Sequence, residues 1–339
     1  MAPDRPFKAN LIRKPDPLGS QPKTSLGDCM IEVSQLSRVY GDYTAVEACS
    51  FAIQRGEVVG LLGHNGAGKT TIMKMLTGFL EPTSGTILID GLALNREANT
   101  VQGRIGYLPE NCPVWPEMTV MAYLEYHADL RGIADIDKPR AIARAIRRTA
   151  LQEKALAPIA TLSRGYRQRV GVAQAILHDP DIIILDEPTN GLDPTQIRQM
   201  RDLIRELAKE ATVILSTHIL QEVQAVCERV LILKQGKLVV DATLATLQSG
   251  GRLRLTTAKT AQATLASQLE SAQIESLPST DGLYHYALNV PAQQTPQIAQ
   301  AVVEGGLGLH GLHFEKQNLE SLFAQINQQP QTHGEVGHG

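Results

Sequence analysis

Residues 63–70, GHNGAGKT, have types and spacing that could bind nucleotide phosphates. They fit the pattern G-x-x-x-x-G-K-[ST] and lie between an apolar stretch that predicts a strand and a stretch that predicts a helix. Glycines let backbone N–H groups crowd around phosphate oxygens, and the helix N-terminus adds partial positive charge. In such a loop Lys69 would reach the β- and γ-phosphates, and the Thr70 hydroxyl would ligate Mg²⁺. The competing interpretation is an ordinary glycine-rich turn, which the matching context disfavours.

Two carboxylates end a second apolar stretch, DIIILDEP, at residues 181–188. Asp186 would hold Mg²⁺ through its water shell, and Glu187 would orient or deprotonate an attacking water. An acidic pair at a strand end is weak evidence by itself, so the upstream phosphate loop is what favours catalysis. His218, in STHIL after another apolar stretch, could contact the γ-phosphate at the same sheet edge. Taken alone, such a histidine is more typical of a structural role.

These segments, together with LSRGYRQRV at residues 162–170, resemble the ATP-binding cassette of ABC transporters over about residues 30–245. GHNGAGKT resembles Walker A, IIILDEP resembles Walker B, and LSRGYRQRV resembles the LSGGQ-type signature. NGLDP resembles the D-loop and STHIL the H-loop. RVYGDYTAV places Tyr40 where the family stacks an aromatic ring on adenine, and IGYLPE falls at the family's Q-loop. The set of ordered motifs is far more specific than any one of them.

The resemblance implies ATP and Mg²⁺ as cofactors and ATP hydrolysis as the activity. It assigns catalysis to Lys69, Glu187 and His218, with Glu187 activating water. It assigns Mg²⁺ to Thr70, Glu110 and Asp186. The residues that it assigns to nucleotide binding are Tyr40, Val46, Gly63, His64, Asn65, Gly66, Ala67, Gly68, Lys69, Thr70, Thr71, Glu110, Ser163, Arg164, Gly165 and Asp193.

The resemblance also implies two partners. In these ATPases two cassettes meet head to tail, and each signature reaches the γ-phosphate held by the Walker A loop of the other. Ser163 and the backbone at Gly165 would donate to that phosphate. Hydrolysis should therefore require a second ATPase subunit, with a homodimer as the expectation, and the dimer would drive a separate integral membrane permease subunit. Closing and opening would follow the different affinities of ATP and ADP for the closed state.

Two departures from the family pattern indicate a subgroup. Arg164 and Tyr166 stand where the consensus signature has glycine and glutamine, and Glu110 stands where most relatives carry glutamine. Both resemble the subgroup that serves ABC-2-type exporters, including gliding-motility and multidrug assemblies. We expect the signature to work and Glu110 to be tolerated. Import is the alternative direction, but importers usually keep the Q-loop glutamine.

Composition excludes several classes of protein. A net charge of −3 over 339 residues argues against a protein that coats nucleic acid. The longest apolar runs are far shorter than the roughly 18 residues needed to span a bilayer. The four cysteines have no paired spacing, which argues against a disulfide framework or a zinc site. The segment after Met1 has no apolar block, so it does not resemble a secretory signal. We expect a cytoplasmic protein, peripheral on the cytoplasmic face of the plasma (inner) membrane, with no nucleic-acid partner.

The alternation of strand and helix signals predicts an α/β P-loop NTPase fold of the ABC cassette type. It would have an antiparallel β-subdomain, a helical subdomain, and a small C-terminal α+β domain with a ferredoxin-like β-α-β-β-α-β order. Helices are expected over 119–132, 139–157 and 164–178. The predicted domains are a proline-rich tail at 1–28, expected to be disordered, the ATPase domain at 29–247 with its helical subdomain at about 111–178, the C-terminal domain at 248–328, and a disordered tail at 329–339.

Some features leave two interpretations open. The arginines at 140, 144, 147 and 148 would share one helix face, either solvated or in contact with anionic headgroups or an acidic partner. Trp115 could pack in the core or lie where the family's helical subdomain receives the membrane subunit. The histidines at 285, 310 and 313 have no ligand spacing that would assign a metal.

Two rival functions differ from transport. A soluble ABC-type ATPase acting on ribosomes or DNA predicts tandem cassettes, long coiled-coil insertions or zinc-binding cysteines, and the sequence has none of these. A degenerate cassette used as a binding module predicts a damaged Lys69 or Glu187, and both residues are intact.

Overall fold

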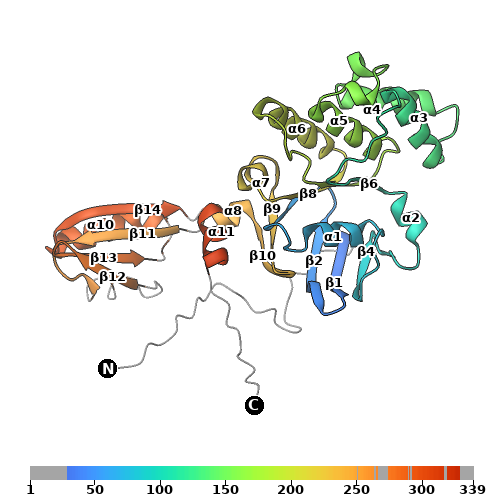
Figure 1. Cartoon of the computed structure of the whole chain (residues 1–339). Helices are drawn as coiled ribbons and strands as arrows, with labels where there is room; N and C mark the ends of the chain where they lie inside the picture. The colour runs from blue at the N-terminus through green and yellow to red at the C-terminus, as the bar shows by residue number, and fades with distance from the viewer. Residues whose placement is uncertain are drawn as a thin grey trace. The chain divides into compact units, whose positions relative to one another are not determined.

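The computed structural model contains two compact units that divide after Asp241 (Figure 1). The predicted boundary at residue 247 falls inside helix α8 (Leu244–Ser249). The two units are described separately below. The residues that the structure describes are 29–249, 251–262, 265, 274–288, 290, 292–316 and 319–328.

The first unit is built on a six-stranded sheet in the order β10-β9-β3-β8-β7-β6. β3 pairs in parallel with β8 and β9, β8 with β7, and β7 with β6. Every residue of β3, β7 and β8 is buried, as expected for parallel strands covered on both faces. The strands are β3 (Val58–Leu62), β6 (Ile105–Leu108), β7 (Ile182–Asp186), β8 (Thr212–Thr217), β9 (Arg229–Lys234) and β10 (Lys237–Thr243).

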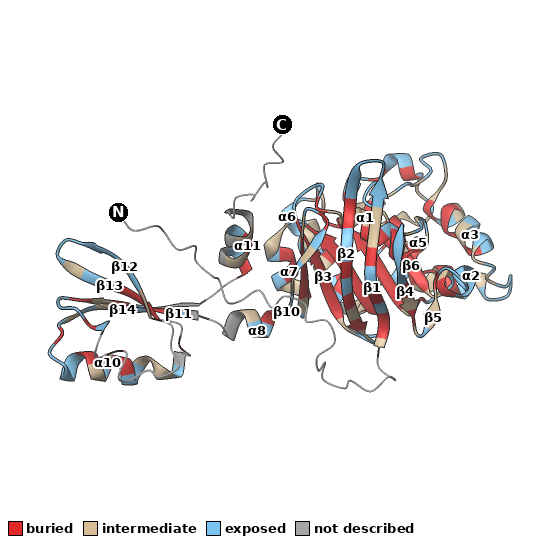
Figure 2. Cartoon of the chain, turned by 90° about the horizontal axis from the view of Figure 1, so that it is seen from below, coloured by how far each residue is buried: buried red, intermediate tan, exposed pale blue. Residues whose placement is uncertain are grey.

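A second, antiparallel sheet has the order β2-β1-β4-β5. One hydrophobic cluster joins it to the six-stranded sheet, because Ile31 and Ile53 pack in the same core as Val59 and Ile184. In Figure 2 the buried positions run along β1, β2 and β3. This is the predicted antiparallel β-subdomain, and its strands are β1 (Cys29–Tyr40), β2 (Tyr43–Gln54), β4 (Ser84–Ile89) and β5 (Leu92–Ala93).

Helices lie between the strands and also form a helical segment after β6. Thr119 caps the first helix of that segment by accepting from the Ala122 N–H. Among the described residues, no helix has both the length and the apolar composition to cross a bilayer. The helices of this unit are α1 (Lys69–Leu76), α2 (Ala98–Gln102), α3 (Val120–Leu130), α4 (Lys138–Arg148), α5 (Arg164–Ala175), α6 (Pro194–Leu207) and α7 (Leu220–Val226).

The prediction of one helix over 139–157 is wrong beyond Arg148. The Thr149 hydroxyl donates to a carbonyl one turn back, and Ala150 adopts a positive φ of 54°. A left-handed residue ends an α-helix because the next N–H can no longer reach the regular acceptor. The chain continues as a separate 3₁₀ turn at Gln152–Lys154.

The four arginines of α4 differ in their partners and exposure. Arg144 lies 3.1 Å from Asp179, and Arg148 lies 3.0 Å from both Glu206 and Glu210. Two of the four arginines therefore pair with acids of the same chain, which removes them from the surface that an anionic partner would need. The other two lie at exposed positions.

Trp115 does not pack in the core. Its side chain is 48% exposed, and its ring lies 4.7 Å from that of Tyr126, centroid to centroid. The core-packing interpretation of Trp115 is therefore wrong, and the residue belongs to the surface of the helical segment.

The second unit has a four-stranded antiparallel sheet in the order β12-β13-β11-β14. Strands consecutive across each predicted helix are separated by one other strand, which is the split βαβ arrangement of ferredoxin-like folds. The first predicted helix of this unit, within 261–273, lies mostly outside the described residues. The elements are β11 (Gly251–Thr257), β12 (Ile274–Thr280), β13 (Leu283–Leu288), α10 (Thr295–Glu304), β14 (Leu309–Lys316) and α11 (Leu319–Gln328).

Candidate functional site

The loop between β3 and α1 has the backbone geometry of a phosphate cradle. Gly66 and Gly68 have φ of 82° and 103°, and a Cβ on Gly68 would lie 2.6 Å from the Ala45 carbonyl oxygen. Only glycine fits there without moving the backbone. Lys69 is buried, and its Nζ donates to the carbonyls of Gly63 at 2.7 Å and His64 at 3.4 Å. The loop thus folds around the head of its own lysine.

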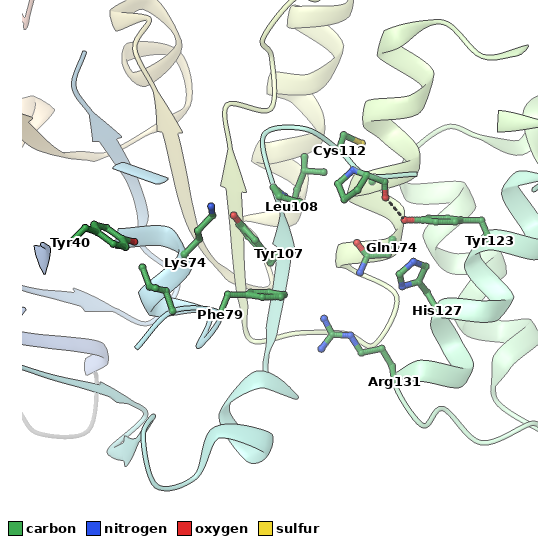
Figure 3. A pocket seen from close by; sticks show the side chains of 14 residues that line it. Tyr40, Lys74, Phe79, Tyr107, Leu108, Cys112, Tyr123, His127, Arg131 and Gln174 are labelled. Atoms are coloured by element: carbon green, nitrogen blue, oxygen red, sulfur yellow. Dashed lines mark hydrogen bonds between the residues drawn. The ribbon is translucent and has the colours of Figure 1, made fainter. Parts of the chain in front are cut away.

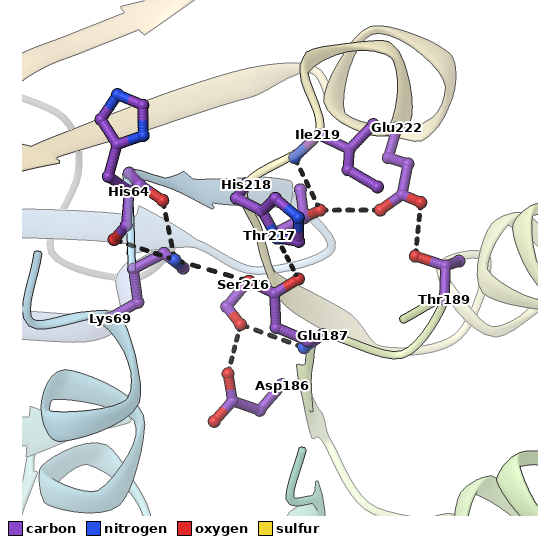
Figure 4. Close-up of polar contacts among 11 residues, drawn as sticks. His64, Lys69, Asp186, Glu187, Thr189, Ser216, Thr217, His218, Ile219 and Glu222 are labelled. Carbon is purple, nitrogen blue, oxygen red and sulfur yellow. Dashed lines mark hydrogen bonds and ion pairs between the residues drawn. The ribbon is translucent and has the colours of Figure 1, made fainter. Parts of the chain in front are cut away.

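The end of β7 brings the two predicted carboxylates beside that lysine (Figure 4). Glu187 Oε1 lies 3.4 Å from Lys69 Nζ, and Glu187 Oε2 lies 2.9 Å from His218 Nδ1. Asp186 is fully buried, and its Oδ1 accepts from the Ser216 hydroxyl. The structure therefore places Lys69, Asp186, Glu187 and His218 in one connected set of charges and hydrogen bonds.

The parallel register of three strands explains this convergence. β3, β8 and β7 are neighbours, and each supplies its carboxyl end to the same edge of the sheet. Ligand sites of open α/β sheets lie at that edge. Glu187 has a φ of 48°, and its N–H donates to the carbonyl and hydroxyl oxygens of Ser216 at 3.2 and 3.1 Å. Ser216 on β8 thereby fixes the residue that follows β7.

A pocket of about 270 Å³ opens beside these groups. Val46, Gly63 and Ala67 do not line it. Val46 still lies beside the loop, because its Cγ2 would be 3.3 Å from a Cβ placed on Gly68. The Gly63 carbonyl accepts from Lys69 Nζ. Ala67 is buried in the same loop. The lining includes ten of the predicted site residues, which are Tyr40, His64, Asn65, Gly66, Gly68, Lys69, Thr70, Thr71, Glu110 and Glu187.

The signature residues lie elsewhere, against the segment that follows Glu187. None of Ser163, Arg164 and Gly165 lines the 270 Å³ pocket. Ser163 caps α5 by accepting from the Tyr166 N–H at 3.4 Å. A Cβ on Gly191 would lie 2.5 Å from Arg164 Cζ. The arginine that stands in place of the consensus glycine therefore packs on the predicted D-loop. The chain brings its signature to its own D-loop and not to its own phosphate loop.

Asp193 has a local role in this chain. Its Oδ1 accepts from the N–H groups of Thr195 and Gln196, both at 2.9 Å, which makes it the N-cap of α6. The side chain of Gln196 packs closely on the signature, because a Cβ on Gly165 would lie 2.5 Å from Gln196 Cδ. The D-loop is therefore tied to both the signature and the start of α6.

The chemistry of the donor set fits a hard cation. Asp186 Oδ2 is buried and has no hydrogen-bond partner among the described residues, and a buried carboxylate oxygen without a partner is costly. Thr70 and Glu110 line the neighbouring pocket. Burial, with the negative charges of Asp186 and Glu110, raises the pKa of the Tyr107 hydroxyl above its usual value. In the described part of the chain, no three His, Cys, Asp or Glu side chains form a metal cluster by themselves.

Sequence reasoning missed several residues of this site. Tyr43 and Ala45 line the pocket, and the buried hydroxyl of Tyr107 lies close enough to Asp186 and Glu110 to sense their charge. Ser216 holds both Asp186 and the Glu187 backbone. Only Ser216 carried a usable signal, because it lies two residues before His218 at the end of an apolar strand.

The chain is similar in sequence to known ATP-binding proteins. A family model described as ABC transporter matches residues 46–190. The uncharacterized ABC transporter ATP-binding protein YdbJ of Bacillus subtilis is 31% identical over 91% of this chain and 99% of that protein. The bacitracin transport ATP-binding protein BcrA of Bacillus licheniformis is 38% identical over 62% of this chain and 69% of that protein.

A solved structure has a similar fold over about two thirds of the chain. The structure of cbiO1 from Clostridium perfringens, described as part of the ABC transporter complex cbiONQ, superposes with a TM-score of 0.59 at 28% identity. The match covers 64% of this chain and 89% of that one.

The pocket geometry predicts that ATP stabilises the protein through Lys69. Because a ligand that binds only the folded state adds about 2.7 kcal/mol at a hundred times its dissociation constant, saturating MgATP should raise the melting temperature by several degrees. Lys69→Ala should abolish this rise in a thermal-shift measurement. Lys74→Ala, at an exposed position of the same helix, is the matched control and should keep it. A full ATP-dependent shift in Lys69→Ala would contradict the placement of the phosphates.

Proposed function

The chain belongs to the ABC transporter family of ATP-binding proteins, and we propose that it is the ATP-hydrolysing subunit of an ABC-2-type exporter. YdbJ, which is named as an ABC transporter ATP-binding protein, is 31% identical to this chain over nearly the whole length of YdbJ. ATP-binding cassettes of this family are ATPases coupled to transport. The proposal adds the roles of individual residues, the dimer, the metal and the kind of membrane partner.

The observation that carries the proposed chemistry is the position of Glu187 between Lys69 and His218. Its carboxylate is buried and ends at the pocket that the phosphate loop encloses. We assign Lys69 to the β- and γ-phosphates, where its charge offsets the charge of the triphosphate. Glu187 accepts the proton of the attacking water, and His218 holds the carboxylate in place from the opposite side.

The proposed metal site comprises Thr70, Asp186 and Glu110. Bound Mg²⁺ would neutralise charge on the β- and γ-phosphate oxygens. Asp186 Oδ2, which has no hydrogen-bond partner among the described residues, and the exposed Glu110 carboxylate supply oxygen donors of the type that Mg²⁺ prefers. Glu110 adds negative charge beside the triphosphate compared with the glutamine of most relatives, which the cation would offset.

The first proposed partner is another copy of this chain. Ser163 and Gly165 retain the signature's serine and second glycine, yet neither lines the phosphate pocket of its own chain. Ser163 is exposed at the start of α5, where backbone N–H groups remain without intrahelical partners. A head-to-tail homodimer would bring this helix start to the γ-phosphate of the other copy and complete two ATP sites.

The second proposed partner is an integral membrane permease subunit, a separate chain. ATP-binding subunits of this family work with membrane subunits, and cbiO1 is described as part of such a complex. BcrA, at 38% identity, is named for bacitracin transport, which supports export for this chain. The protein would then lie on the cytoplasmic face of the plasma (inner) membrane. No nucleic-acid partner enters this proposal.

A pocket of about 600 Å³ is the proposed docking surface for that permease (Figure 3). Its walls are largely apolar and aromatic, with Phe79 75% exposed and 5.8 Å from the ring of Tyr107, and with Tyr123 on the far side of the pocket (Figure 3). Burial and the charge of Arg131 lower the pKa of His127, which favours its neutral form. A short amphipathic helix of the permease would fit such a surface.

The proposed domain layout is an ATPase domain at 29–247, with its helical subdomain at about 111–178, and a C-terminal domain at 248–328.

The alternative function is that of a soluble ABC-type ATPase that acts on a macromolecular complex. The two functions differ in which proteins bind to the ATP-bound chain.

The site predicts that Glu187→Gln separates binding from hydrolysis. Removing a general base costs roughly 10²–10⁴-fold, so turnover in a phosphate-release assay should fall at least about a hundredfold. With MgATP the variant should accumulate as a dimer of the 36.8 kDa chain in light scattering. Glu153→Gln, at an exposed position, is the control and should behave as wild type. A Glu187→Gln protein that hydrolyses ATP normally, or stays monomeric with ATP, would overturn the assignment.

The exporter proposal predicts which proteins co-purify with the ATP-bound Glu187→Gln variant. Tagged Glu187→Gln protein, purified with MgATP from detergent-solubilised cells, should bring a multi-span membrane protein that mass spectrometry identifies. The further change Phe79→Ala should reduce that recovery, because the exposed ring is a wall of the proposed docking surface. Recovery of ribosomal or DNA-repair components alone would favour the soluble alternative.

A further inference from the structure

A buried carboxylate that the proposed reaction does not use lies behind the site. Glu222, in α7, is 1% exposed. Burying an ionised group is costly unless it is well hydrogen-bonded, so its partners show what it does. Both partners are buried hydroxyls, of Thr189 and Thr217 (Figure 4).

Each oxygen of the Glu222 carboxylate accepts one hydroxyl. Oε1 accepts from Thr189 Oγ1, and Oε2 accepts from Thr217 Oγ1 at 2.7 Å. Both hydroxyls therefore point their protons at Glu222. Thr217 Oγ1 keeps its lone pairs for the Ile219 N–H, which donates to it at 3.1 Å. The carboxylate thereby sets the direction of every hydrogen bond in this group.

The two threonines belong to the two segments that leave the sheet edge. Thr217 is the last residue of β8 and directly precedes His218. Its bonds to Glu222 and to the Ile219 N–H brace the backbone on both sides of that histidine. Thr189 follows Glu187 by two residues, and its backbone carbonyl accepts from the Leu192 N–H at 3.1 Å, at the start of the D-loop. One side chain therefore joins the His218 segment to the segment that carries Asp193.

We propose that Glu222 is a positioning residue that holds His218 against Glu187 and couples that contact to the D-loop. The inference rests on the proposed function, since it concerns the same hydrolytic site. Glu222 touches neither nucleotide-pocket atoms nor reacting groups in this arrangement, because it does not line the pocket. Its effect on hydrolysis passes through His218, whose position it links to the D-loop through Thr189.

The first test is Glu222→Gln, with Glu228→Gln at an exposed position as the matched control. The amide nitrogen donates where the carboxylate oxygen accepted, so one of the two threonine hydroxyls can no longer donate to residue 222 and must turn, while the side-chain volume is kept. Because a positioned acid or base contributes roughly 10²–10⁴-fold, loosening it should lower kcat for ATP about tenfold. KM for ATP should change less than about twofold, since the phosphate loop is untouched. Glu228→Gln should match wild type.

The second test asks whether Glu222 acts through His218. In a His218→Ala background, Glu222→Gln should lower kcat no further, because the positioned group is already gone. A second, independent tenfold fall in that background would show a general structural effect and overturn the proposal. So would a Glu222→Gln enzyme with wild-type kcat, or one changed only in KM.

A third pair of variants keeps the proposal testable if Glu222→Gln does not fold. Thr217→Ser retains the hydroxyl and should keep near-normal kcat, whereas Thr217→Val removes it and should lose about tenfold with KM unchanged. Equal activity of the two would overturn the role of this bond. Absence of ATP hydrolysis by the wild-type chain would instead defeat the proposed function, so the two failures are distinguishable.

Discussion

The proposed site depends on one buried carboxylate, that of Glu187, held between a lysine and a histidine. It lies 3.4 Å from Lys69 and 2.9 Å from His218, and its backbone has a φ of 48°. Such a φ costs on the order of 1–3 kcal/mol for a residue with a Cβ, so the surroundings must impose it. Ser216 does so by accepting the Glu187 N–H with two oxygens. Strain and charge pairing together aim the carboxylate into the phosphate pocket.

The rest of the first unit can be understood from that requirement. β3, β7 and β8 are entirely buried and parallel, so their register is fixed and their carboxyl ends cannot slide apart. They deliver Lys69, Glu187 and His218 to one edge. α5 instead delivers Ser163 to a different face, beside the D-loop, where a second chain could use it. The chain thus fixes its own phosphate loop and carboxylate at one sheet edge and places its signature elsewhere.

The sequence predicted the parts of this arrangement whose signals are local. The phosphate loop and the buried β7 and β8 follow from short patterns of glycine and apolar residues. The end of α4 could not be predicted, because a left-handed Ala150 leaves no compositional trace. Ser216 and Glu222 were missed for another reason: their partners lie 30 and 33 residues away and meet them only in the folded sheet. The position of Arg164 on Gly191 is likewise a tertiary contact.

The most direct test of a site shared between two copies is to mix two inactive variants. Lys69→Ala removes the phosphate contact and Ser163→Arg blocks the signature, so each protein alone should hydrolyse almost no ATP. Mixed head-to-tail dimers would contain one intact site, and turnover should recover to about a quarter of the wild-type rate if subunits exchange at random. No recovery above the sum of the two variants would contradict the shared site and place hydrolysis within a single chain.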